Sequence, residues 1–188
     1  MRLGNDLYEV TVTEIPDSTF ASEHTQGFDD IFLPETVSVD HPLKALAIEA
    51  TGRDSTWKVC PIGDCLCFIH DYAYLEGDQL IVLQNDTISQ IDIRTHQLAV
   101  HQKLECFGCC LGMYPCPGGY IVYGEMEIFR IDERFDTVWR VSGADKFVSP
   151  DIFPPFKIED GVIKVYDWDN NYYEFNFDWH CLDERRSE

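Results

Sequence analysis

The clearest pattern of hydrophobic and polar positions lies in residues Tyr120 to Val141. Tyr120 to Tyr123 is apolar throughout, and Gly124-Glu125 supplies a turn. In Met126 to Asp132, Phe129 and Ile131 then alternate with Arg130 and Asp132. After a short polar turn, Thr137 to Val141 places Trp139 and Val141 on one face. Alternation with a period of two indicates β-strands. The segment therefore predicts three antiparallel strands joined by tight turns.

Related patterns recur upstream and downstream. In the best match, Gln79 to Gln84 is apolar, Asn85-Asp86 predicts a hairpin turn, and Thr87 to Arg94 and Gln97 to Lys103 follow as strands. The other two segments run from Leu46 to Val59 and from Val162 to Phe177. Repetition at a fixed period is the sign of an array of similar small units.

The period of the repeat is about 40 to 46 residues. It comes from aligning four residues, Ile48, Ile91, Ile131 and Phe177, which are separated by 43, 40 and 46 positions. We expect repeat units at approximately residues 7–60, 65–105, 111–147 and 153–185, within a single domain over residues 1–188. The predicted fold is all-β, with about four antiparallel units of three to four strands each.

Two strands are apolar at every position, Leu80 to Leu83 and Tyr120 to Tyr123. A strand that is apolar on both faces needs cover on both faces, so stacked small sheets fit better than one sheet with a wet face. The apolar, cysteine-rich run from Val59 to Tyr74 is broken by Pro61 and Gly63. No helix longer than two turns is expected.

Tryptophans follow the central turn in two of the units. Ile131-Asp132 is followed by a polar turn and Trp139, and Thr51-Gly52 is followed by Trp57. This pattern resembles the repeat of quinoprotein-type, tryptophan-docking β-propellers. The other units depart from it, because position 99 is Ala and Trp179 is out of register.

The resemblance implies a small or partial β-propeller-like array and no particular activity. No segment matches a cofactor-binding motif, so no cofactor is expected. Three arrangements stay open: a small closed ring, an open partial propeller, and half of a ring completed by a second copy. The last would be a homodimer formed through open sheet edges.

The chain is strongly acidic, with 34 Asp and Glu against 14 Lys and Arg and a formal net charge of −20. Such a charge repels phosphate backbones and anionic lipid headgroups, which excludes nucleic acid and membranes as expected ligands. A basic protein is the favoured partner. The alternative is that the acidity only keeps the protein soluble.

The cellular setting is also an expectation. Met1 to Val10 holds one basic residue and no apolar run of a secretory signal, and no segment approaches the roughly 20 apolar residues of a membrane span. We expect a cytoplasmic, bacterial-type protein whose eight cysteines stay as thiols.

Two groups of residues are weighed as metal sites. Zinc binding through the Cys60–Cys67 and Cys106–Cys116 groups is an alternative to buried core thiols, although the spacing lacks two matched Cys-x-x-Cys knuckles. Asp167, Asp169, Asn171 and Asp178 follow the spacing of a calcium loop. Position six of that loop, which needs Gly, is Tyr172, so a hairpin turn is favoured.

No nucleophile elbow, phosphate-binding glycine loop or metalloprotease motif is present. His70-Asp71 is the one His-Asp pair to check, and a loop role is favoured because neighbouring strand residues face opposite ways. We therefore expect a non-enzymatic interaction module, such as an acidic inhibitor or immunity-type protein. The rival is a carbohydrate-active or other small-molecule enzyme with a carboxylate pair in an aromatic-lined cleft.

Exposed aromatics and long connections are the candidate recognition elements. Packing between the sheets is expected to bury most of the aromatic residues, and an exposed patch that contains Trp168 and Trp179 is the alternative. The connections Phe20 to Pro34 and Gly143 to Pro155 are the long irregular segments, and such loops on a rigid scaffold often carry recognition.

Overall fold

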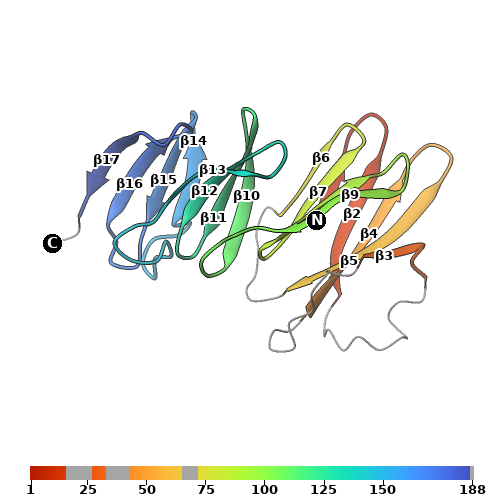
Figure 1. Ribbon diagram of the computed structural model, residues 1–188, viewed down its shortest axis with the longest axis horizontal. Coiled ribbons are helices and arrows are strands. Elements are labelled where there is room, and N and C mark those ends of the chain that lie inside the picture. Colours follow the sequence, from red (N-terminus) through yellow and green to blue (C-terminus); the bar gives the residue numbers. More distant parts are fainter. Residues whose placement is uncertain (16–26, 33–42, 65–71, 187–188) are drawn as a thin grey trace. The chain divides into compact units, whose positions relative to one another are not determined.

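Every element in the described part of the chain is a β-strand. The computed structural model describes residues 1–15, 27–32, 43–64 and 72–186. These residues form four sheets, called A to D in chain order, without a helix (Figure 1). The expected all-β fold built from four similar units is confirmed.

Sheet A has five strands in the order β1-β2-β4-β5-β3. Their bounds are Arg2–Gly4 (β1), Glu9–Ile15 (β2), Asp30–Phe32 (β3), Leu43–Thr51 (β4) and Thr56–Asp64 (β5). Strand β3 lies parallel to β5, whereas the other neighbours are antiparallel. Sheet A is thus larger than the three or four strands expected, because β3 pairs with the outer edge of β5.

Sheets B, C and D each have four antiparallel strands in chain order. The strands of sheet B are β6 (Ala73–Glu76), β7 (Gln79–Gln84), β8 (Thr87–Asp92) and β9 (Gln97–Lys103). Those of sheet C are β10 (Cys110–Cys116), β11 (Gly119–Gly124), β12 (Ile128–Asp132) and β13 (Thr137–Val141). Those of sheet D are β14 (Phe156–Glu159), β15 (Val162–Tyr166), β16 (Tyr172–Asn176) and β17 (Cys181–Arg185). Such four-stranded meanders are propeller-like blades.

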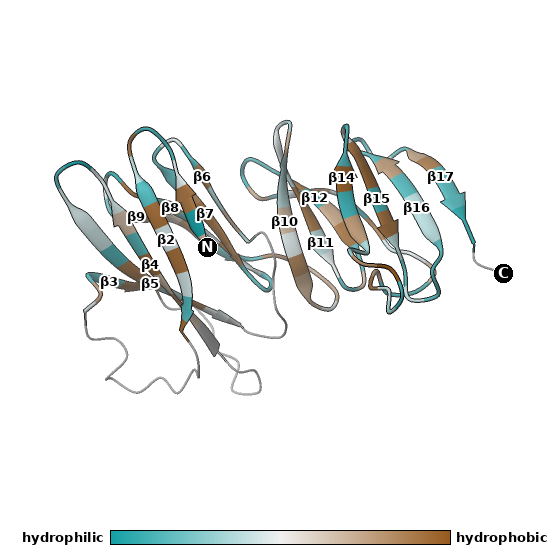
Figure 2. Cartoon of the chain, turned by 180° about the vertical axis from the view of Figure 1, so that it is seen from behind, coloured by the Kyte–Doolittle hydropathy of each residue, from teal (hydrophilic) through white to brown (hydrophobic). Residues whose placement is uncertain are grey.

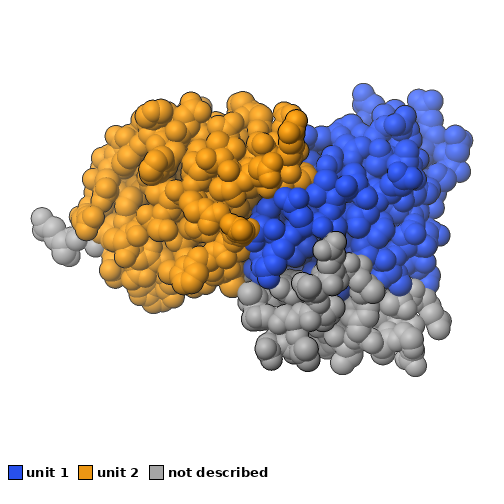
Figure 3. All heavy atoms as spheres, viewed as in Figure 1, with its two compact units in different colours: residues 1–104 blue, residues 105–188 orange. Residues whose placement is uncertain are grey.

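The chain divides into two compact units (Figure 3). Unit 1, residues 1–104, contains sheets A and B, and unit 2, residues 105–188, contains sheets C and D. Each unit therefore holds two of the four repeats. The single domain expected over residues 1–188 stays a prediction.

Two-residue hairpin turns join several of the strands. Gln84 pairs with Thr87 across Asn85-Asp86, where Asn85 has a φ of 52°. Asp160-Gly161 joins β14 to β15, with φ values of 52° and 76°. Asn, Asp and Gly tolerate this left-handed region, and the twist of such turns matches that of the strands. The hairpin expected at Asn85-Asp86 is confirmed.

The turn between the third and fourth strands is closed by the same type of hydrogen bond in sheets B, C and D. The last residue of the third strand accepts a hydrogen bond on its side-chain oxygen from a backbone N–H three or four residues later. The bonds are Thr95 N to Asp92 Oδ1 (2.8 Å), Asp136 N to Asp132 Oδ1 (3.0 Å) and His180 N to Asn176 Oδ1 (2.7 Å).

The position of this turn hydrogen bond shows that the alignment of the last repeat must be changed. The register shifts at Ile91 in sheet B, at Ile131 in sheet C and at Phe175 in sheet D. Phe175, and not Phe177, is therefore the equivalent of Ile91 and Ile131. The expected alignment was wrong by two residues because it required an aromatic or aliphatic residue followed by Asp, whereas Asn176 takes the place of Asp132.

Each unit has its core between its two sheets. In unit 1, Ile48 of sheet A and Ile91 of sheet B belong to one apolar cluster, and in unit 2, Ile121 of sheet C and Phe175 of sheet D belong to another. Figure 2 shows apolar residues along β15, in the middle of sheet D. All six residues of β11 are buried. The cover expected on both faces of this strand is confirmed.

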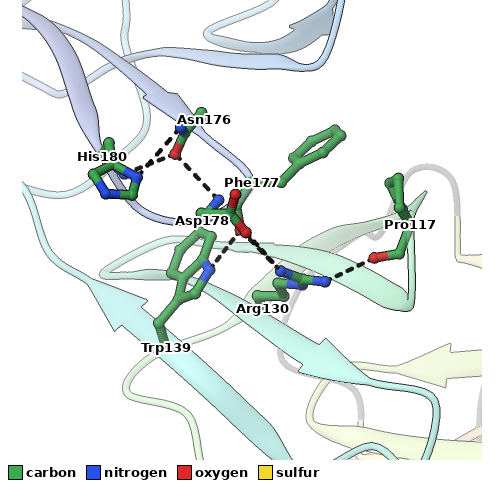
Figure 4. A network of polar contacts seen from close by, with 7 residues as sticks. All are labelled: Pro117, Arg130, Trp139, Asn176, Phe177, Asp178 and His180. Atoms are coloured by element: carbon green, nitrogen blue, oxygen red, sulfur yellow. Dashed lines mark hydrogen bonds and ion pairs between the residues drawn. The ribbon is translucent and has the colours of Figure 1, made fainter.

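Both docking tryptophans contact the neighbouring sheet of their own unit. The Trp57 ring on β5 stacks on His96 of the β8–β9 turn, with ring centroids 4.6 Å apart, and its Nε1 donates to Asp30 Oδ2 at 3.0 Å. Trp139 on β13 donates from Nε1 to the Phe177 carbonyl of the β16–β17 turn at 2.8 Å (Figure 4). The quinoprotein type of the repeat stays a prediction.

Arg130 strengthens the same contact in unit 2. Its guanidinium donates to the Phe177 carbonyl at 3.2 Å and to the Pro117 carbonyl at 2.7 Å, and lies 3.5 Å from Asp178 Oδ1 (Figure 4). One carbonyl at the turn of sheet D thus accepts two hydrogen bonds from sheet C. These bonds fix how sheet D sits on sheet C.

Replacing Trp139 with Phe tests this contact. A smaller aromatic ring is kept and the indole N–H that donates to the Phe177 carbonyl is lost, so we expect the free energy of unfolding to fall by about 1 kcal/mol. Urea unfolding measures the change. Val138→Ala, at a 53% exposed position on the same strand, is the matched control and should shift stability by less than about 0.5 kcal/mol. Equal effects of the two substitutions would contradict the docking role.

Candidate functional site

Consecutive antiparallel hairpins place alternate connections at opposite ends of a sheet. In unit 2, one end carries four segments, which we call the loop surface: residues 105–109, 125–127, 142–155 and 167–171. Backbone hydrogen bonds join them: Glu125 N to Cys109 O (2.7 Å), Phe147 N to Glu125 O (2.5 Å) and Trp168 N to Lys146 O (2.8 Å). The four segments therefore form one continuous surface.

Phe147 anchors the longest of these segments. Its side chain is fully buried in the core between sheets C and D, and its carbonyl accepts the Tyr123 hydroxyl. A Cβ on Gly143 would lie only 2.8 Å from the Phe147 ring, so a residue without a side chain is needed there. The connection expected to carry recognition, Gly143 to Pro155, is thus held firmly against its own unit.

Asp167 anchors the β15–β16 turn from inside the protein. Its buried carboxylate accepts hydrogen bonds from Asn171 N at 2.8 Å, Asp169 N at 3.1 Å and the Tyr173 hydroxyl at 2.9 Å. The carboxylate oxygens face turn donors, and Asp178 lies beyond β16 at the opposite end of the sheet. The turn interpretation is confirmed, and these four acidic and amide residues do not form a calcium loop.

Glu127 plays the corresponding part in sheet C. It is 5% exposed, its Oε1 accepts the backbone N–H of Phe107 at 2.9 Å, and the Arg140 guanidinium lies 3.7 Å away. In sheet B, Asp86 on the equivalent turn is buried and pairs with Lys103 at 2.8 Å. A buried carboxylate on the second hairpin turn is a repeated feature that the sequence pattern did not identify.

Three aromatic side chains protrude from the loop surface. Phe153 is 91% exposed, Phe107 is 71% exposed and Trp168 is 44% exposed. All three stand on segments that backbone hydrogen bonds join, and exposed large apolar groups on one surface can mark an interaction site. Phe107 and Phe153 were not singled out from the sequence, since nothing in their spacing distinguishes them from core phenylalanines.

Trp179 does not belong to this surface. It lies in the β16–β17 turn with a φ of 60° and is 51% exposed, whereas Trp168 lies in the β15–β16 turn. Successive turns of a meander lie at opposite ends of a sheet. Both tryptophans are exposed, so the packing that was favoured for them is wrong, and the two residues do not share one patch.

The loop surface is also acidic. Four carboxylates on it are solvent-exposed: Glu105, Asp145, Asp151 and Asp169. The cations in or beside it already have partners. Lys146 Nζ lies 4.0 Å from the Trp168 ring centroid, and Arg140 donates to the Glu105 carbonyl at 3.1 Å and contacts Glu127. The surface thus presents aromatic rings among negative charges.

The enzyme alternative finds no support at the cavity in unit 1. This cavity of about 480 Å³ lies over β1, β2 and β4. Its lining residues are Arg2, Leu3, Gly4, Glu9, Val10, Thr11, Glu49 and Thr51. It contains two carboxylates but no aromatic residue, and Glu49 already pairs with Lys58 at 2.9 Å. His70-Asp71 lies outside the described residues.

The described cysteines do not assemble into a zinc site. Cys106 to Cys110 lies at the start of β10 and Cys116 at its end. Six residues of strand at about 3.3 Å each separate these positions by about 20 Å. Over residues 1–15, 27–32, 43–64 and 72–186, no three His, Cys, Asp or Glu side chains are grouped to hold a metal. Cys65 and Cys67 of the other group lie outside these residues.

Two solved structures resemble the chain at low sequence identity. The crystal structure of BamB from Moraxella catarrhalis matches with a TM-score of 0.49 and 10% identity, covering 81% of this chain and 49% of that one. The crystal structure of HIRA(644-1017) matches with a TM-score of 0.47 and 11% identity, covering 98% and 52%. The chain spans about half the length of the solved structures it matches.

No protein-family model matches the chain, and no curated protein matches it either. Within the part of the chain that the structure describes, no helix is long and apolar enough to cross a membrane.

The anchoring role of Asp167 can be tested by substitution. Asp167→Ala would leave several buried donors, including the Tyr173 hydroxyl, without their acceptor, so we expect a loss of about 2 to 3 kcal/mol in the free energy of unfolding. Asp169→Ala, in the same turn but exposed, is the matched control. Urea unfolding of both variants measures the difference, and a loss for Asp167→Ala no larger than the control would refute the anchor.

Burial of Cys60 predicts a loss of stability at alkaline pH. Cys60 packs with Ala45 and Ile62, and burial raises the pKa of its thiol to about 11. An unfolded thiol ionises near a pKa of about 8.5. The folded state therefore holds the proton to higher pH, so the contribution is constant below about pH 8.5 and falls as the pH rises toward 11.

The test compares urea unfolding near pH 8 with unfolding near pH 10.5. Over this interval the wild type should lose about 2 kcal/mol more than Cys60→Ala, which lacks the ionising group. Cys181→Ala, at an exposed position, should behave like the wild type. A loss in Cys60→Ala equal to that of the wild type would show that the thiol is not responsible.

Proposed function

We propose that this protein is a non-enzymatic interaction module that binds a basic protein through the loop surface of unit 2. The observation that supports this most directly is the exposure of Phe107, Phe153 and Trp168 on segments that also carry four exposed carboxylates. Aromatic rings supply contact area at low conformational cost, and carboxylates select cationic partners.

The rigidity of the loop surface supports the same proposal. Phe147, Asp167 and Glu127 hold its segments from inside, through hydrogen bonds that are satisfied within the unit. A surface that is already ordered loses little conformational entropy on binding. The backbone that carries the exposed rings is therefore held in place, although each ring belongs to an irregular segment.

The charge of the whole chain supports a basic partner. A net charge of −20 accelerates encounter with a positively charged protein by about 10- to 1,000-fold where the charge is clustered. We propose an inhibitor or immunity-type role, in which the acidic surface covers the functional face of a basic protein in the cytoplasm of a bacterium. The strong acidity of the chain is the feature that favours this role.

Binding of a fluorescently labelled, lysine-rich peptide provides the test. We expect Phe153→Ala and Trp168→Ala each to weaken binding by about tenfold or more, because exposed aromatic anchors carry a large share of binding energy. Trp179→Ala is the matched control, since Trp179 is equally exposed but lies at the opposite end of sheet D. Fluorescence anisotropy titrations measure the dissociation constants.

Salt provides a second criterion in the same titrations. Affinity should fall as ionic strength rises, because the Debye length shortens to about 10 Å at 0.1 M salt. Affinity that is independent of salt, or lost equally in Trp179→Ala, would refute the proposed loop surface. A variant whose unfolding free energy is also reduced would be replaced by the corresponding Leu substitution, which keeps an apolar group.

A further inference from the structure

Trp168 of the loop surface already binds a cation, and that cation belongs to the protein itself. Lys146 Nζ lies 4.0 Å from the centroid of the Trp168 ring. The ring face of tryptophan attracts ammonium groups more strongly than any other aromatic side chain. Trp168 is 44% exposed, so its ring is partly open to solvent beside the lysine. The geometry points to an ammonium-recognition position at this ring.

The two residues are held together by their backbones. Trp168 N donates to the Lys146 carbonyl at 2.8 Å, and Val148 N donates to the same carbonyl. Lys146 N is held by Asp145 Oδ1 at 2.7 Å, and the next residue, Phe147, is fully buried. The backbone of Lys146 is therefore fixed next to the Trp168 ring, and the lysine side chain loses little conformational entropy when it contacts the ring.

The electrostatic surroundings favour a positive charge at this position. Asp145 precedes Lys146 and Asp169 follows Trp168, and both carboxylates are exposed. A lysine of a basic partner would meet the same ring and the same negative field. Lys146 and such a lysine cannot both occupy the ring face, because like charges at close range repel.

We propose that Trp168 is the recognition position for a lysine side chain of the partner, and that Lys146 occupies it in the free protein and must be displaced on binding. This inference rests on the proposed function and adds the chemical group recognised and an internal competitor. Lys146 then sets the affinity of the surface: it keeps the ring covered until a partner with many positive charges displaces it.

The competitor can be removed without removing the ring. Lys146→Met keeps the aliphatic stem and deletes the charge, so the lysine-rich peptide should bind about two- to fivefold more tightly, the range expected from an exposed cation–π contact. Lys146→Arg retains a cation and should bind like the wild type. Lys157→Met deletes an equal charge on β14, where Lys157 pairs with Glu159, and should give no such gain.

A double-mutant cycle decides whether the gain acts through the ring. In a Trp168→Leu background, Lys146→Met should give little or no gain, because no ring is left to uncover. In NMR spectra of Lys146→Met, the indole N–H resonance that is absent from Trp168→Leu should shift when peptide is added. An equal gain in both backgrounds, or no gain in Lys146→Met, would overturn the proposal.

The outcomes separate this inference from the proposed function. If Phe153→Ala weakens peptide binding but Lys146→Met does not strengthen it, the displacement of Lys146 is wrong and the loop surface still binds basic partners. If neither the wild type nor Lys146→Met binds the peptide, both the proposed function and this inference are wrong. Tighter binding by Lys146→Met and Lys157→Met alike would show a general effect of net charge and would also reject the ring position.

Discussion

Sheets B and C each contain a strand that is apolar on both faces, so the structure depends on packing another layer against them. The tryptophan contacts show how neighbouring sheets of one unit are held together. In unit 2, the Phe177 carbonyl accepts hydrogen bonds from both Trp139 and Arg130, which belong to sheet C. Apolar contact between sheets is non-directional and would allow them to slide. Directed bonds to a single carbonyl remove that freedom, because an altered register would leave partly buried donors unpaired. In unit 1, Trp57 contacts sheet B by stacking on His96, and its Nε1 donates to Asp30 within sheet A.

The turns at the two ends of each four-stranded sheet are stabilised in different ways. At one end, Asp92, Asp132 and Asn176 close short turns between strands of their own sheets. The turns that follow Asp92 and Asn176 contact the docking tryptophans. At the other end, buried carboxylates such as Glu127 and Asp167 hold the connections between strands or sheets. The tryptophan contacts therefore lie at one end, and the irregular segments that carry exposed rings lie at the other. In unit 2 these segments form the loop surface.

Much of the strand pattern follows from the sequence, and the omissions have physical causes. Strands β7, β8 and β11 to β13 were predicted because their apolar positions are flanked by strong turn residues such as Asn85-Asp86. The first strand of sheets B, C and D was not predicted. Strand β10 contains Pro115 and a glycine, and β14 is only four residues long, so neither shows a clear period of two.

The candidate site was harder to predict than the strands. Whether an aromatic residue such as Trp168 packs in a core or protrudes depends on the end of the sheet that its turn occupies, and this requires the full strand count. Asp167 was one acidic residue among 34, and only its coordinates show that the carboxylate points inward to Asn171 and Tyr173. Composition bears on the proposed basic partner only through the net charge, because long-range electrostatics depend on the sum of the charges.

The outward face of sheet D shows how a repeat can end. On β16, Tyr172 and Glu174 alternate with the core residues and hydrogen-bond to each other. Arg185 lies 5.3 Å from the Tyr172 ring, and Lys164 pairs with Glu159 at 3.0 Å. Terminal repeats of stacked arrays need such a polar outer face. Packing a further sheet here would strip water from these paired charges, and burial of ion pairs is costly. The outward face of sheet D is therefore polar, whereas its inward face holds Tyr173 and Phe175 of the core.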